Sequence, residues 1–362
     1  MQLRRLWLTD FRGYRDAEVV FDPGLTAVVG SNGQGKTNLL EAIAYLATLG
    51  SFRGAPLDAL IRSGAERAVV RAEGERGGRS LLLEAELVAG GRNRTQLNRQ
   101  PLRRARDLLG AMRVTVFSPD DLSLVKGGPG ERRAYLDDML VTLHPRHDQV
   151  RSDLDRVMRQ RGALLKQAGG RMTDEVALTL DVFDAKLVVA GEALALARRE
   201  LVGELAPVLS AAYDRVAQRS AAVTMTYEPP WMAEGLASAL AAARRDDLRR
   251  GVSTVGPHRD EVDLAIGGLP GRTHGSQGEQ RSVALALRLA AHEVVTRCIE
   301  TPPVLLLDDV FSELDAGRSA ALLDALPPGQ TVLTTATALP VGAEPGKVLS
   351  VEEGTVTERT GA

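Results

Sequence analysis

The chain has 362 residues, which is enough for two or three domains. Hydrophobic residues make up 44% and charged residues 25%, as in ordinary globular proteins, and the net charge of −2 indicates no particular partner. No apolar run approaches the roughly 18 residues of a membrane span, and the N-terminus lacks the apolar core of a signal peptide, so we expect a cytoplasmic protein without membrane association. The single cysteine, Cys298, follows an apolar stretch and is predicted to be a buried, structural thiol.

The first 120 residues are predicted to alternate between short strands and one helix. From Lys36 onward, apolar residues recur at three- and four-residue spacing, which predicts an amphipathic helix over residues 36–49. A Gly77-Gly78 turn between two alternating runs predicts an antiparallel hairpin. The strands are expected at residues 3–8, 17–21, 26–29, 68–72, 81–87 and 112–117.

A phosphate-binding loop joins the third strand to this helix. The eight residues that begin at Gly30 match the pattern G-x-x-x-x-G-K-[ST] in full. Glycines allow the backbone to turn its N–H groups toward an anion, and the positive end of the following helix adds to that attraction. Lys36 is therefore expected to reach the β- and γ-phosphates of ATP, and the Thr37 hydroxyl to ligate Mg²⁺. The expected nucleotide contacts here are Gly30, Ser31, Asn32, Gly33, Gln34, Gly35, Lys36, Thr37 and Asn38.

Six arginines gather within residues 92–106, where no acidic residue occurs. Such a run is able to neutralise nucleic-acid phosphates, so these side chains form a candidate DNA-binding strip. A solvated charged surface explains the same run, and this alternative stays open. The strip consists of Arg92, Arg94, Arg99, Arg103, Arg104 and Arg106.

The middle of the chain is predicted to be a helical arm inserted into an α/β head. Over residues 131–250 the apolar side chains recur at helical spacing among many charges. Thr173 is placed to cap a long helix, and Pro207 marks a kink or a boundary. The expected division is a head of residues 1–120 and 251–362, and an arm of residues 121–250.

After residue 253 the α/β pattern returns, and it brings two acids to the end of a strand. Residues 304–307 form an apolar run, typical of a central parallel strand, and Asp308 and Asp309 follow it. A carboxylate at the carboxyl end of such a strand lies where α/β sheets bind ligands. Asp308 is expected to hold Mg²⁺, and Asp309 to orient or deprotonate the attacking water. Further strands are expected at residues 261–266 and 331–335, and helices at 277–298 and 316–326.

A second helix start is a candidate phosphate contact. Ser276 precedes the helix predicted over residues 277–298, and a helix N-terminus with a serine hydroxyl binds anions. An ordinary helix cap is the alternative interpretation. The position of this segment before the acidic strand resembles the signature segment of ABC ATPases, in which a serine and a glycine contact the γ-phosphate held by the partner subunit. That resemblance makes Ser276 and Gly278 candidate ligands, and Ser276 a candidate catalytic residue together with Lys36 and Asp309.

Taken together, these motifs resemble the RecF family of bacterial recombination mediators. The more particular pieces are Gly-Pro-His-Arg-Asp at residues 256–260 and the paired acids Asp308 and Asp309. The other matching pieces are residues 10–14, 32–43, 51–53, 117–122, 276–281 and 306–315. The resemblance implies an SMC-like, ABC-type ATPase head, with mixed sheets packed on helices, that carries an α-helical arm in place of a long coiled coil.

The same resemblance implies function and partners. It implies an ATP-dependent homodimer that binds double-stranded DNA or its junctions with single-stranded DNA, hydrolyses ATP slowly with Mg²⁺, and assists RecA loading through RecR and RecO. By analogy with the family, Arg12 and Tyr14 are expected to flank the adenine. Two alternatives from other classes remain: a subunit of an ABC transporter, and a nucleotide-controlled scaffold that binds only proteins.

Three departures from the ABC pattern concern the reaction. Asp309 stands where these ATPases usually carry glutamate, and its shorter side chain predicts slow turnover. Residues 331–337 contain no histidine for the switch position, and which threonine replaces it stays open. No glutamine is evident in the loop after residues 112–117, so Asp120 or Asp121 is expected to serve there.

Overall fold

The computed structural model describes residues 2–217 and 221–359, which form two compact units. The first unit comprises Met1–Leu122, Val208–Ala221 and Ser276–Ala362, and the second comprises Ser123–Pro207 and Ala222–Gly275. These bounds differ from the expected division in three places. Residues 121–122 and 208–221 are assigned to the first unit, and residues 251–275 to the second, where their strand pairs with another strand of that unit.

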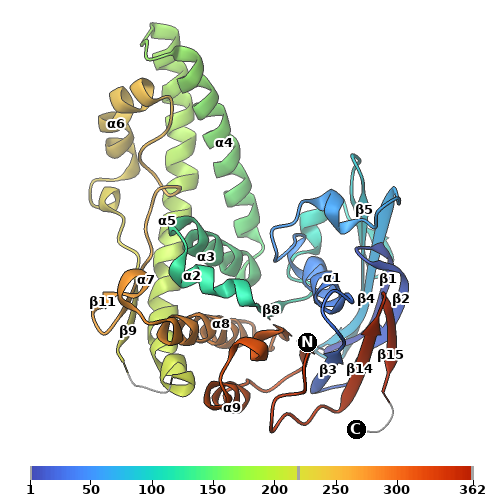
Figure 1. Ribbon diagram of the computed structural model, residues 1–362. Coiled ribbons are helices and arrows are strands. Elements are labelled where there is room, and N and C mark those ends of the chain that lie inside the picture. The colour runs from blue at the N-terminus through green and yellow to red at the C-terminus, as the bar shows by residue number, and fades with distance from the viewer. Residues whose placement is uncertain (1, 218–220, 360–362) are drawn as a thin grey trace. The chain divides into compact units, whose positions relative to one another are not determined.

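One sheet of the first unit is antiparallel and contains the predicted N-terminal strands (Figure 1). The hairpin predicted across Gly77-Gly78 is confirmed, since β4 and β5 pair antiparallel around that turn. Two short strands, β6 and β7, extend the sheet beyond the predicted elements. In spatial order the strands are β2 (Tyr14–Val20), β1 (Gln2–Phe11), β4 (Arg67–Arg76), β5 (Arg79–Val88), β6 (Arg94–Leu97) and β7 (Gln100–Pro101).

The other sheet of the first unit is largely parallel and contains the phosphate-loop strand and the acidic strand. Apart from its antiparallel edge strand β15, its neighbours pair in parallel, as the continuous apolar run of residues 304–307 predicts for β12. The edge strand β15 and its neighbour β14 were not predicted. In spatial order the strands are β15 (Thr355–Glu358), β14 (Lys347–Glu352), β3 (Leu25–Val29), β13 (Thr331–Thr335), β12 (Val304–Asp308) and β8 (Val114–Phe117).

Helix α1 (Lys36–Thr48) shares one hydrophobic core with both sheets. Its apolar residues Leu39, Leu40, Ile43 and Leu46 are fully buried, which is the stripe that the sequence predicts. The other α-helices that lie wholly in this unit are α8 (Gln277–Ile299) and α9 (Ala316–Asp324). Short 3₁₀ helices span Leu57–Leu60, Ala105–Leu108, Pro119–Leu122 and Val310–Glu313.

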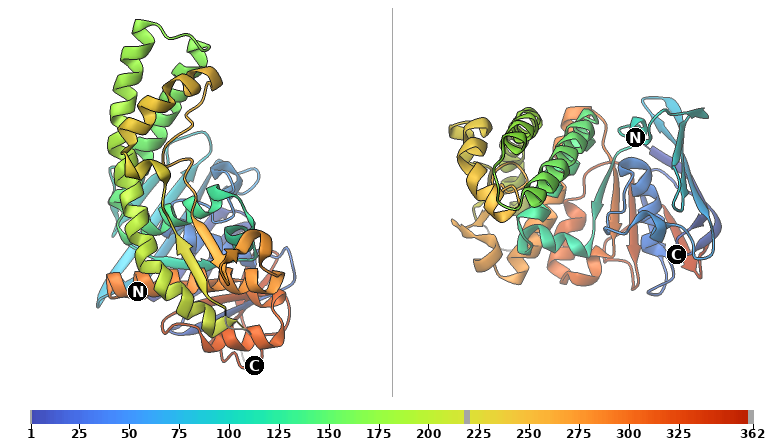
Figure 2. Two further views of the ribbon diagram at one scale, coloured as in Figure 1. Left: turned by 90° about the vertical axis from the view of Figure 1, so that its left-hand side faces the viewer. Right: turned by 90° about the horizontal axis from the view of Figure 1, so that it is seen from above.

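The second unit is mostly helical. Its two long helices are joined at the Gly169-Gly170 turn, at the top of Figure 1 and of the left view of Figure 2. The α-helices are α2 (Ser123–Lys126), α3 (Pro129–Leu143), α4 (Arg146–Ala168), α5 (Asp174–Val216), α6 (Leu236–Arg250) and α7 (Gly271–His274), and a 3₁₀ helix spans Pro230–Ala233. A small sheet orders β11 (Leu269–Pro270), β10 (Asp263–Ile266) and β9 (Val223–Thr226), so the expectation of helices alone up to residue 250 is wrong for residues 223–226.

Two details of the long helix follow from its sequence. Thr173 precedes α5, and its hydroxyl accepts a hydrogen bond from the Val176 N–H at 3.3 Å, as the predicted cap requires. The helix continues through Pro207 to Val216, so the proline does not end it, although the boundary between the two units falls there.

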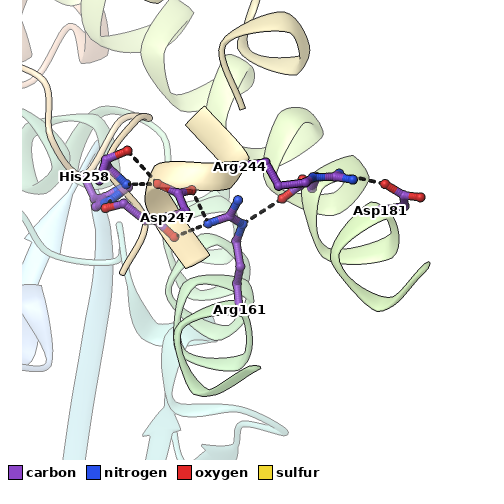
Figure 3. Close-up of polar contacts among 8 residues, drawn as sticks. Arg161, Asp181, Arg244, Asp247 and His258 are labelled. Carbon is purple, nitrogen blue, oxygen red and sulfur yellow. Dashed lines mark hydrogen bonds and ion pairs between the residues drawn. The ribbon is translucent and has the colours of Figure 1, made fainter. Parts of the chain in front are cut away.

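A cluster of buried charges ties the helices of the second unit together (Figure 3). The Arg161 side chain on α4 is fully buried and donates to Asp184 on α5 and Asp247 on α6, each at 2.7 Å. Arg244 binds Asp184 as well and also reaches Asp181. Because each buried arginine has carboxylate partners, the cluster stabilises one arrangement of these three helices.

Two further expectations concern the surface. None of the helices in the described part of the chain is both long and apolar enough to cross a membrane. The expectation for Cys298 is wrong: its thiol is exposed. The buried face of α8 ends at Val295, so the last turn of that helix extends beyond the core.

Candidate nucleotide-binding site

The phosphate loop is built between β3 and α1, and close packing requires its first glycine. A Cβ atom at Gly30 would lie 2.4 Å from the backbone oxygen of Val351 on β14, so no larger residue fits there. The Lys36 ammonium donates to the carbonyl oxygens of Gly30 at 2.8 Å and Ser31 at 2.9 Å. The loop therefore encircles its own lysine, and a phosphate would offer that ammonium a charged acceptor in place of two neutral ones.

Asp308 and Thr37 converge at the foot of this loop. The Thr37 hydroxyl donates to Asp308 Oδ1 at 2.9 Å, across 271 positions of the sequence. Thr334 lies opposite Asp308 in the parallel pairing of β12 and β13, and its hydroxyl donates to the same oxygen at 2.8 Å. The Asp309 N–H in turn donates to Thr334 Oγ1 at 3.0 Å. Thr334 therefore fixes both acids, a role that the sequence alone does not assign to any particular threonine.

The negative charges of Asp308 and Asp309 are not fully compensated by their surroundings. Burial raises the pKa of Asp308, and the neighbouring charge of Asp309 raises it further. Hydrogen bonds from Thr334 and Thr37 and the charge of Arg53 act in the opposite direction. Asp309 adopts a left-handed backbone conformation with φ 48° and ends with Oδ1 buried and without a hydrogen-bond partner among the described residues. Left-handed non-glycine residues are uncommon and cluster at functional sites.

These groups fit a bound Mg²⁺. A hydroxyl and carboxylate oxygens are the ligands that this ion prefers, and its charge would compensate the two neighbouring acids. Lys36 compensates these acids only in part: its charge interacts with both of them, but its ammonium donates to loop carbonyls, and burial lowers its pKa despite the opposing effect of Asp309 and Asp308. The arrangement therefore suits a cation that is brought together with a polyphosphate.

Tyr14 and Arg12 support the loop from the neighbouring sheet. The Tyr14 ring is fully buried, and its hydroxyl donates to the Gly35 carbonyl at 2.9 Å. The Arg12 guanidinium forms a two-pronged ion pair with buried Glu41 on α1, at 2.7 and 2.8 Å. Tyr14 thus braces the loop rather than presenting a face to a base, and contact of Arg12 with the adenine stays a prediction.

A polar cavity of about 750 Å³ opens beside the loop. Its volume is within the usual range for small-molecule sites. Gln34 in its wall accepts a hydrogen bond from the Glu353 N–H at 2.7 Å, which connects the loop to the turn between β14 and β15. The cavity is lined by Gly30, Ser31, Gln34, Thr337, Glu352 and Arg359, among others.

The other half of the expected site, at the start of α8, is exposed. Ser276 is the N-cap of α8, and its hydroxyl and N–H both donate to Glu279 Oε2, at 2.7 and 2.8 Å. The cap interpretation of Ser276 is therefore observed in this chain. A role toward a partner's nucleotide, for Ser276 and for Gly278, stays a prediction.

The two acids expected to replace the missing glutamine, in the loop after β8, have different surroundings. Asp121 is buried and accepts from Arg288 on α8 at 2.6 Å and from the Ser118 N–H at 2.9 Å. Asp120 is exposed. Asp120 is therefore the better candidate to face a ligand.

The six arginines of the candidate strip do not all line the same cavity. Arg92, Arg94 and Arg103 line a cavity of about 890 Å³, whereas Arg99 lines a different cavity. Arg94 lies 3.7 Å from Glu86, and Arg104 pairs with Asp107 at 2.9 Å. Arg106 is placed on a 3₁₀ helix that begins at Ala105. The main candidates for DNA contact are therefore the three arginines that line one cavity, Arg92, Arg94 and Arg103.

Comparison with known proteins agrees with this architecture. The profile described as "RecF/RecN/SMC N terminal domain" matches residues 2–335. A protein of Streptomyces avermitilis named "DNA replication and repair protein RecF" is 45% identical over 98% of this chain and 99% of its own length. A protein of the same name from Kineococcus radiotolerans is 47% identical over 93% of each chain.

Solved structures show the same likeness. A structure of the recombination mediator protein RecF with ATP, from the RecFOR pathway, has a TM-score of 0.90 and 27% identity and covers 99% of this chain and 98% of its own. An Smc head domain with an extended coiled coil, derived from Pyrococcus furiosus, has a TM-score of 0.59 at 16% identity, covers 99% of this chain and 96% of its own, and is similar in fold alone.

Proposed function

This chain belongs to the RecF family of DNA replication and repair proteins, and on that premise we propose that it closes on DNA as an ATP-bridged homodimer. The observation that supports this most directly is the construction of the phosphate site. Lys36, Thr37 and Asp308 are already assembled in one chain, whereas Ser276 and Gly278 are presented at an exposed helix start. The expected homodimer is symmetric, so each ATP would be bound from two sides, by the loop of one copy and the α8 start of the other.

Each residue has a defined role in this proposal. The loop N–H groups and Lys36 bind the phosphates, while Thr37 and Asp308 hold Mg²⁺, which would polarise the γ-phosphate. The Ser276 hydroxyl and the Gly278 N–H complete the γ-phosphate site from the second copy. Loss of the γ-phosphate on hydrolysis removes the shared ligand, so the dimer opens.

Asp309 is the proposed base or orienting group for the attacking water. Its buried Oδ1 has no partner among the residues that the structure describes, so it is available to accept a hydrogen bond from water. Its carboxylate is one methylene shorter than the usual glutamate, which limits its reach, and we therefore expect slow hydrolysis. Thr334 holds the Asp309 backbone and so maintains this orientation.

DNA is the proposed partner of the closed dimer, either double-stranded or at a junction with a single strand. Contacts to phosphates, with Arg92, Arg94 and Arg103 as the main candidates, would give binding with little dependence on sequence. By family membership we also expect RecR and RecO as partners in RecA loading.

DNA binding with and without ATP, at two salt concentrations, tests this proposal. We expect ATP to increase affinity for duplex DNA in the wild type but not in Ser276→Arg, which places a long side chain where the partner's γ-phosphate would bind. Ser276→Arg should still bind ATP as a monomer. ATP-dependent dimers that bind no DNA at either salt concentration would instead favour a scaffold that binds proteins.

A further inference from the structure

An arginine lies against the glycine of the α8 start. Arg318, on α9, places its guanidinium so that a Cβ atom built at Gly278 would lie 2.4 Å from Nη2 and 3.0 Å from Cζ. The absence of a side chain at Gly278 is what allows this approach. The glycine therefore serves both to expose the helix N–H groups and to admit a cation beside them.

The cation is held in place by the chain's own groups. Arg318 Nη1 donates to Asp315 Oδ2, and Nε lies 3.4 Å from the hydroxyl of buried Ser282 on α8. The Arg318 N–H also donates to Asp315 Oδ1 at 2.9 Å, which caps α9. The Arg318 side chain is still 20% exposed, so an incoming ligand is able to reach it.

The position of this guanidinium is electrostatically unfavourable without an anion. The N-terminus of α8 carries the positive end of the helix dipole, and a second positive charge there requires compensation. Two carboxylates provide it: Asp315 binds Arg318, and Glu279 accepts from both the N–H and the hydroxyl of Ser276. The donors expected to hold the partner's γ-phosphate are thus occupied by acids of the same chain.

We propose that Arg318 is a further ligand of the γ-phosphate of the partner's ATP, and that this phosphate displaces Glu279 and Asp315. The inference rests on the proposed ATP-bridged dimer and specifies how its second half binds phosphate. A terminal phosphate carries more charge and more acceptor oxygens than one carboxylate, so it is able to replace both acids. ADP lacks that group and leaves Glu279 on Ser276. The exchange of anions therefore makes closure depend on the triphosphate.

Four variants of the full chain test this inference. Arg318→Gln removes the charge, Arg318→Lys keeps the charge without the planar fork, and Glu279→Gln keeps a capping acceptor without the negative charge. Arg249→Gln is the matched control, since Arg249 and Asp246 form an exposed ion pair with the same three-residue spacing on α6. Analytical ultracentrifugation with a non-hydrolysable ATP analogue and Mg²⁺ gives the dimer Kd, and ATP affinity is measured at concentrations where the protein is monomeric.

We expect Arg318→Gln to weaken the dimer by about 10- to 100-fold, because glutamine cannot form the charge-assisted hydrogen bonds of the guanidinium, with monomer ATP affinity unchanged. The dimer Kd of Arg318→Lys should lie between those of Arg318→Gln and the wild type. Glu279→Gln should dimerise more tightly than the wild type, and Arg249→Gln should have the wild-type dimer Kd. Wild-type dimerisation of Arg318→Gln, loss of ATP affinity in its monomer, or weakening by Glu279→Gln would overturn the inference. A wild type that stays monomeric with the analogue would instead contradict the proposed function itself.

Discussion

Two buried clusters of charge in this protein are balanced in opposite ways. In the second unit, Arg161 binds Asp184 and Asp247, and every charge in the cluster has a partner of opposite sign (Figure 3). In the first unit, Asp308 and Asp309 lie side by side, and Lys36 is bound to carbonyl groups rather than to either acid.

The difference separates a scaffold from a binding site. The ion pairs of the second unit compensate the charges that they bury and so fix one arrangement of helices, although Arg161 Nη2 and Arg244 Nε have no hydrogen-bond partner among the described residues. In the first unit the pKa of Asp308 is raised, and Asp309 has an oxygen without a partner among the residues that the structure describes, so ligands can still lower the energy of these acids. Changes in the second cluster should therefore affect folding, and changes in the first should affect binding.

The largest effect is expected for Lys36→Met. Its loss removes the one positive side chain inside the loop, so ATP binding should disappear at concentrations that saturate the wild type. Because Lys36 binds only loop carbonyls in this structure, the folded protein should lose little stability. Isothermal titration with ATP and Mg²⁺ measures the ATP affinity, and thermal unfolding measures the stability. Retained ATP affinity would contradict the assignment of the loop.

The opposite pattern is expected for Arg161→Met. This change leaves Asp247 and Asp184 buried and short of a cation, which should lower the free energy of unfolding by about 3–5 kcal/mol. ATP affinity should match the wild type under conditions where the variant is folded. Urea-induced unfolding measures the loss, with Arg249→Met as the exposed control, for which about 0–1 kcal/mol is expected. A loss as small as that of the control would remove the distinction between the two clusters.

A smaller effect, of opposite sign, is expected for Asp308→Asn without metal. A raised pKa means that the folded protein holds this proton more tightly than the unfolded chain does. The ionised carboxylate therefore lowers stability above the ordinary aspartate pKa, and this penalty vanishes as the pH falls below that value. The variant should melt at a higher temperature than the wild type at pH 7.5, with a smaller difference at pH 4.5.

With ATP and Mg²⁺ added, the wild type should melt at a higher temperature than Asp308→Asn, since the variant lacks the carboxylate that holds the ion. Thermal unfolding at both pH values, with and without the ligands, follows these changes. A variant that melts below the wild type at pH 7.5 without metal would show that the Asp308 carboxylate is stabilised rather than strained.

The smallest effect is expected in the candidate DNA surface. Replacing Arg92, Arg94 and Arg103 with glutamine should reduce the slope of log Kobs against log salt by about 0.9 for each DNA phosphate that the protein no longer neutralises. ATP binding and dimerisation should not change. Fluorescence anisotropy with duplex DNA over a series of salt concentrations measures the slope, and Arg104→Gln is the control, because Asp107 already pairs with Arg104. An unchanged slope in the triple variant would place the DNA site elsewhere.

The sequence predicts the phosphate site better than its surroundings, for a physical reason. The loop pattern and the apolar strand before Asp308 are local signals, so both elements form where they were expected. Thr334 depends on the register between β12 and β13, a pairing that the sequence alone does not reveal. The strands β14 and β15 do carry a local signal that could have predicted them, since alternating residues flank the turn at Gly354.

Packing and charge pairing explain why two other predicted sites, at Tyr14 and at the arginines of residues 92–106, differ from the structure. Tyr14 has the right position in sequence to contact a base, yet packing makes it a brace for Gly35. The arginines of residues 92–106 contain no acid among them, yet Glu86 and Asp107 lie close to two of them in space. The contact with Glu86 depends on the pairing of β5 and β6, which charge patterns along the chain do not reveal, whereas Asp107 is a local partner, three residues after Arg104.

The bridging of one ATP by two chains is tested most directly by mixing two defective variants. Lys36→Met lacks a working loop and Ser276→Arg lacks a working helix start, so each alone should stay monomeric with a non-hydrolysable ATP analogue. A heterodimer of the two would contain one intact composite site, formed by the loop of Ser276→Arg and the α8 start of Lys36→Met. Sedimentation of differently labelled chains should therefore show association only in the mixture and only with nucleotide. Association by either variant alone, or none in the mixture at any concentration, would contradict the bridge.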